Sequence, residues 1–90
     1  MDYLSYNISK NLNRIRISRG MSLDDVAEQT GVSKSMLYQI EQGNANPSIN
    51  VLGKIASGLR LEFTELIASP PEESYLVKIP DVYPIKSSDK

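Results

Sequence analysis

The residues best suited to chemistry lie just after position 33 and carry hydrogen-bonding tips with little charge. Lys34, Ser35, Tyr38, Gln39 and Gln42 follow the spacing i, i+1, i+4, i+5 and i+8, which places them on one side of a helix. Ammonium, hydroxyl and amide groups gathered on one helix face suit hydrogen bonding to the edges of base pairs. The same residue types also form ordinary solvated helix faces, and that is the alternative reading.

The sequence lacks two of the side chains that enzymes use most often for catalysis. The 90 residues include no histidine and no cysteine, which removes the common neutral-pH acid–base group, the thiolate nucleophile and the usual zinc ligands. A Ser–Lys or carboxylate pair would have to replace them, and no such spacing stands out. We therefore expect a protein that is not an enzyme and uses no cofactor or metal.

Apolar residues at helical spacing predict five helices before residue 69. The first is expected at about Ser5–Arg19 and the last at about Glu62–Ala68. The second and third are expected to end at Gly31 and Gly43, because glycine commonly follows a helix C-terminus. Three serines stand where N-caps are expected for the middle helices: Ser22, Ser33 and Ser48. The predicted fold class is all-α.

A change of composition divides the chain into residues 1–69 and 70–90. Four of the five prolines follow the boundary. Within the tail, Tyr75, Val77 and Ile79 alternate with other residues, as in a short strand. Such a strand would pair with the same strand of a second copy or begin a missing second domain, and the sequence leaves both possibilities open.

Residues 23–42 combine two short helices with a tight turn. Ala27 provides the small side chain that a steep helix crossing needs. Gly31 provides a residue that tolerates positive φ in the turn. Leu37 and Ile40 are expected to seat the second helix on the first, which turns its polar face outward.

The chain resembles the helix-turn-helix domains of the phage-repressor family, that of lambda repressor and Cro. The resemblance rests on Ala27, Gly31, Leu37 and Ile40, in register with Glu41-Gln42-Gly43 and Pro47-Ser48. The likeness covers about Ile8 to Ala68. It implies a compact five-helix lambda-repressor-like domain and a transcriptional regulator, expected to be a repressor, that binds specific double-stranded DNA. The helix that opens at Ser33 would enter the major groove.

The resemblance also implies contacts for individual residues. Lys34, Ser35 and Gln39 would meet base edges, and Tyr38 would touch a base, a sugar or a phosphate. Phosphate contacts are implied for three further places: Asn44, Asn46 and the N-terminus of the helix capped by Ser48. Both asparagines also suit a simple turn.

The comparison with the family pattern draws attention to Leu23 and to the pair of Arg16 and Glu41. The family usually has a polar residue where this chain has Leu23, and leucine cannot make its hydrogen bonds to phosphate. Only the backbone N–H groups of the helix opening at Ser22 are left for that contact. The family also pairs an arginine with a glutamate, here Arg16 and Glu41, whereas two unpaired surface charges are the alternative.

The formal net charge of −1 hides an uneven distribution. Residues 1–20 carry a net charge of +3 and residues 21–43 a net charge of −3. This balance predicts weak non-specific binding to DNA and leaves open that the same fold binds a protein. A domain of this size is expected to act as a homodimer on a pseudo-palindromic operator. No apolar run is long enough to cross a membrane, and we expect a cytoplasmic protein.

Overall fold

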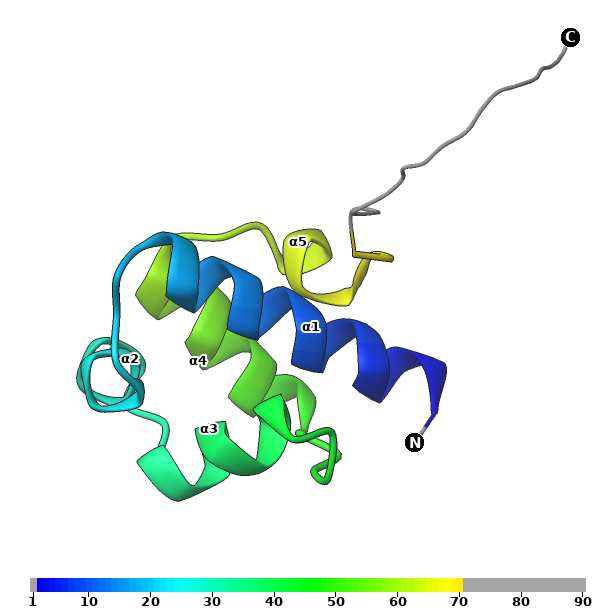
Figure 1. The fold of residues 1–90 in the computed structure, drawn as a ribbon, viewed down its shortest axis with the longest axis horizontal. Helices are drawn as coiled ribbons and strands as arrows, with labels where there is room; N and C mark the ends of the chain where they lie inside the picture. Colours follow the sequence, from blue (N-terminus) through cyan, green and yellow to red (C-terminus); the bar gives the residue numbers. More distant parts are fainter. Residues whose placement is uncertain (1, 71–90) are drawn as a thin grey trace, which may run out of the picture.

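A computed structural model describes residues 2–70, and all regular structure within them is helical (Figure 1). The five helices are α1 (Tyr3–Ser18), α2 (Leu23–Thr30), α3 (Lys34–Glu41), α4 (Ile49–Leu59) and α5 (Phe63–Ile67). The predicted all-α, five-helix domain is therefore confirmed. The strand predicted at residues 74–79 lies outside the described residues.

Side-chain caps explain where the helices begin. The three predicted serines each accept a hydrogen bond from the backbone N–H three residues on: Ser22 from Asp25 at 3.0 Å, Ser33 from Met36 at 3.1 Å, and Ser48 from Val51 at 3.2 Å. In turn, the carboxylate of Asp25 accepts a hydrogen bond from the backbone N–H of Ser22 at 2.9 Å, which completes a capping box. The first helix starts two residues earlier than predicted, because Asp2 accepts from the N–H of Ser5 at 2.6 Å and caps it.

The long helix α1 lies between α3 and α5, and α2 packs against α3 and α4 (Figure 1). Apolar side chains from all five helices and from the α2–α3 turn meet in one core. Its buried members are Ile8, Leu12, Val26, Val32, Leu37, Ile40, Leu52, Ile55, Ala56, Leu59 and Leu66. This core fixes the orientation of α3, which is too short to be stable alone. No helix within residues 2–70 has the length and apolar character needed to cross a bilayer.

One glycine allows α4 to touch the backbone of α2. A Cβ atom on Gly58 would lie 2.6 Å from the carbonyl oxygen of Gln29 and 2.7 Å from the Cα of Thr30. The sequence pattern assigned a close helix contact in this motif to Ala27, whose side chain is partly buried beside the core. The approach at Gly58 adds a second contact of this kind, which the pattern did not reveal.

Two asparagines of α1 hold the end of α5. Asn11 donates from Nδ2 to the carbonyl oxygens of Leu66 and Ala68, both at 2.7 Å, and Asn7 donates to that of Ile67 at 3.1 Å. Because the last carbonyl groups of a helix have no partner within it, these bonds satisfy them and fix α5 on α1.

Candidate nucleic-acid interface

The turn before α3 is held by local chemistry. Gly31 has φ of 77°, a left-handed conformation that residues with a Cβ rarely adopt, and its N–H donates to the carbonyl of Ala27 at 2.9 Å. Val32 is buried beneath the turn. Leu37 and Ile40 are also buried, with 0% and 2% of their surface exposed. These contacts attach α3 to the domain along its apolar side.

The opposite side of α3 carries the predicted polar face. Lys34, Ser35, Tyr38, Gln39 and Gln42 are all exposed, and Tyr38 keeps 53% of its surface in solvent. The helix lies on the side of α1 that faces away from α5, at the edge of the domain (Figure 1). The structure therefore brings these five side chains together on one accessible surface, which we call the α3 face.

One member of the α3 face has an acidic partner. The Nζ atom of Lys34 lies 3.3 Å from Oδ2 of Asp24 in the first turn of α2, and both side chains are more than half exposed. Exposed pairs of this kind contribute little to stability. The carboxylate nevertheless lowers the positive charge that the α3 face presents to a phosphate backbone.

The flanks of the α3 face hold the predicted phosphate contacts. Asn44 and Asn46 are exposed in the segment between α3 and α4, which precedes the α4 N-terminus capped by Ser48. Leu23 is partly buried and packs against the core, so its side chain serves the packing of α2. The capping box already engages the N–H groups of Ser22 and Asp25, so the N–H groups of Leu23 and Asp24 are the ones available for a phosphate there.

Arg16 and Glu41 join α1 to the end of α3. The arginine donates from Nε to Oε2 at 2.7 Å and from Nη2 to Oε1 at 3.0 Å, a two-point contact. It also donates from Nη1 to the carbonyl of Met21 at 3.0 Å. Only 16% of the arginine side chain and 6% of the glutamate side chain are exposed. The hydrogen bonds to Glu41 raise the pKa of Arg16 above its usual value, so the guanidinium keeps its charge in this contact.

Two polar residues complete this contact and were missed from the sequence. Ser9 donates to the backbone carbonyl of Glu41 at 2.6 Å, and Asn13 donates to its Oε1 at 2.9 Å. With Arg16 they follow the spacing i, i+4 and i+7, a single face of α1 that the pattern contained. We call these three residues and Glu41 the α1–α3 latch. It fixes the C-terminal end of the helix that carries the α3 face.

Comparison with known proteins gives a consistent result. Residues 12–66 match the sequence profile of the HTH_3 family, described as helix-turn-helix. The chain is 43% identical over 83 residues to the HTH-type transcriptional regulator SutR of Escherichia coli (strain K12), covering 92% of this chain and 44% of SutR. It is 35% identical over 69 residues to SinR of Bacillus subtilis, covering 76% and 62%. The chain thus spans less than two thirds of either relative.

Solved structures share the helix arrangement. An HTH_3 family transcriptional regulator from Vibrio cholerae aligns with a TM-score of 0.69 at 49% identity, covering 72% of this chain and 36% of that one. The restriction-modification controller protein C.AhdI from Aeromonas hydrophila aligns with a TM-score of 0.63 at 28% identity, covering 67% and 91%.

Proposed function

Because the chain belongs to the HTH_3 family of helix-turn-helix transcriptional regulators, we propose that it binds specific double-stranded DNA with α3 in the major groove. The observation that carries this proposal is the α3 face itself. Five hydrogen-bonding side chains are exposed on a helix that Leu37 and Ile40 anchor from below. A rigid helix with polar tips meets the geometric need of base reading.

Within this proposal, individual side chains have distinct tasks. The amide of Gln39 pairs with adenine through two hydrogen bonds, and Lys34 donates to guanine O6 or N7. Ser35 and Tyr38 contact neighbouring base or backbone atoms. Since Lys34 contacts Asp24 in the free protein at 3.3 Å, binding exchanges that carboxylate for DNA.

Backbone contacts set the position of α3 along the groove. The N-termini of α2 and α4 direct N–H groups and a positive dipole end toward phosphates. Asn44 and Asn46 lie beside the α4 N-terminus and add neutral hydrogen bonds. These contacts are independent of base sequence, and with a formal net charge of −1 they support only weak binding to random DNA.

The small size of the domain bears on its oligomeric state and on its effect on transcription. One small module buries too little surface on DNA for tight specific binding, so we infer a homodimer on a pseudo-palindromic operator. A dimer seated over a promoter would exclude polymerase, which makes repression, as in the phage-repressor type, the expected effect. Sedimentation of the full chain beside a chain ending at Ser69 tests whether the tail joins the copies. Equal monomer masses for both chains at high micromolar concentration would refute a role of the tail in dimerisation.

A binding selection tests the proposed function. Genomic fragments retained by the protein are sequenced, and a shared motif is expected among them. A gel shift on random DNA at about 50 mM salt, where electrostatic binding is strongest, gives the baseline. Absence of both a motif and any shift would contradict DNA binding and favour the alternative, in which the domain binds a protein.

The substitution Gln39→Ala sharpens the selection. The variant is expected to relax the motif at one or two positions, because it removes the Gln39 amide that reads a base. Gln29→Ala is the matched control, since Gln29 is an exposed glutamine at the end of α2, next to Gly58 of α4. An unchanged motif with Gln39→Ala would show that this side chain does not read the sequence.

A further inference from the structure

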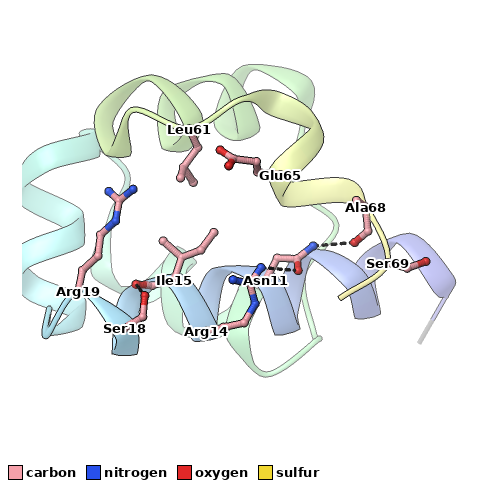
Figure 2. Close-up of a pocket in the computed structure, with 9 residues that line it drawn as sticks. All are labelled: Asn11, Arg14, Ile15, Ser18, Arg19, Leu61, Glu65, Ala68 and Ser69. Carbon is pink, nitrogen blue, oxygen red and sulfur yellow. Dashed lines mark hydrogen bonds between the residues drawn. The ribbon is translucent and has the colours of Figure 1, made fainter. Parts of the chain in front are cut away.

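A polar hollow lies on the far side of the domain from the α3 face. It runs between the C-terminal half of α1 and the segment that leads through α5, and its volume is about 330 Å³ (Figure 2). This volume falls at the small end of the range for ligand pockets. None of its lining residues belongs to α2 or α3. The hollow therefore lies apart from the α3 face.

Two guanidinium groups border this α1–α5 hollow. Arg14 donates from Nη2 to Oδ1 of Asn11 at 3.2 Å, and Arg19 donates from Nη1 to the carbonyl of Leu59 at 2.6 Å. Neither arginine has a carboxylate within ion-pair distance among residues 2–70. Both arginines are exposed, and each makes one neutral contact and keeps further N–H donors in a fork that suits carboxylate oxygens.

The opposite wall supplies an acceptor, and apolar side chains from both sides lie between the charged groups. The carboxylate of Glu65 points into the hollow from α5, across from the arginines (Figure 2). One of its oxygens, Oε1, accepts from the N–H of Glu62 at 2.8 Å, which holds the side chain in place. Ile15 and Leu61 provide apolar carbon between the charged groups. The hollow thus offers two cationic groups, one anionic group and an apolar floor.

We propose that the α1–α5 hollow binds an acidic amino acid. The complementary ligand carries two carboxylates for Arg14 and Arg19, one ammonium group for Glu65, and a short methylene chain for Ile15 and Leu61. A compact dicarboxylic amino acid has this charge pattern and suits the volume of about 330 Å³. A simple dianion such as sulfate lacks the donor for Glu65 and would leave that carboxylate opposed to its own charge.

Titration of the DNA-free protein with L-glutamate, followed by amide NMR, tests the proposal without reference to DNA binding. Saturable shifts are expected in the second half of α1 and in α5, with a Kd near 1 mM or below. Arg14→Gln is expected to weaken binding at least fivefold, and Lys54→Gln, which removes an exposed charge from α4, is the matched control. No saturation by about 20 mM, or equal binding by both variants, would overturn the proposal.

Two comparisons test the role assigned to Glu65 and the choice of occupant. Glutarate, which lacks the ammonium group, is expected to bind at least fivefold more weakly than L-glutamate, and equal binding would refute the contact with Glu65. Glu72 and Glu73 follow closely after Ser69, which lines the hollow. If replacing both by glutamine created glutamate binding that the parent lacks, the chain's own carboxylates would be the occupants and the proposal would be wrong.

Discussion

Breaking the α1–α3 latch at Glu41 is expected to destabilise the domain and lower its affinity for DNA together. Glu41→Ala removes both acceptors of the Arg16 fork, at 2.7 and 3.0 Å, and the acceptor of Asn13 at 2.9 Å. The arginine keeps only the carbonyl of Met21 in a setting where 16% of its side chain is exposed. A charge stripped of its partner in such a site is costly.

The expected magnitude follows from this burial. Removing one partner of a buried ion pair costs about 3–5 kcal/mol. Water reaches part of Arg16, so we expect the lower end, about 3 kcal/mol of unfolding free energy. For a domain of this size that corresponds to a Tm lower by roughly 12–24 °C. Replacing both partners, as in Arg16→Met with Glu41→Leu, is expected to cost much less, because no charge is left unpaired.

Thermal unfolding followed by circular dichroism measures all three variants beside the control Glu28→Ala, an exposed glutamate of α2. The double variant separates loss of the pair from loss of packing. A Tm for Glu41→Ala within about 3 °C of the parent and of Glu28→Ala would refute the reasoning, because a change that small corresponds to less than about 1 kcal/mol.

Three further predictions concern other parts of the domain. Gly58→Ala is expected to lower the free energy of unfolding by about 1–3 kcal/mol, because the added Cβ would meet the α2 backbone. Gly53→Ala, with open space around it, should raise that free energy by about 0.5–1 kcal/mol. Chemical denaturation compares the two variants, and equal effects would contradict the close contact at Gly58. Asp24→Asn is expected to tighten binding to random DNA by releasing Lys34, and an unchanged gel shift would exclude this. The hydrogen bond from the N–H of Ser5 holds the pKa of Asp2 below its usual 3.8, so its stabilisation of α1 is present above that pH and is lost as the pH falls through the lowered pKa. The exchange protection of the first-turn amides, taken relative to their intrinsic exchange rates at each pH, should fall there, and the same fall in Asp2→Asn would refute this role of Asp2.

Local chemistry made most of the fold predictable. The capping serines, the left-handed Gly31 and the helical spacing of Leu37 and Ile40 act within a few residues of the chain, so the pattern alone located α2, α3 and the exposed α3 face. The apolar spacing predicts the start of α1 two residues too late, because the cap at Asp2 precedes the first apolar residue of that spacing.

Contacts between distant segments were harder to predict. The approach at Gly58, the bonds from Asn11 to the end of α5 and the part that Asn13 plays in the latch depend on how helices cross, which no short pattern specifies. The resemblance to a known family supplied the pairing of Arg16 with Glu41, whereas sequence spacing by itself left both as surface charges.

The affinity of the protein for a selected DNA site and for random DNA, measured with Gln39→Ala and Asn46→Ala at matched salt, tests the account most directly. Gln39→Ala is expected to lose about 1–3 kcal/mol on the selected site and little on random DNA, because its amide reads a base. Asn46→Ala is expected to weaken both to the same degree, because it contacts phosphate. Equal losses on both DNAs for Gln39→Ala would contradict the claim that the α3 face reads sequence.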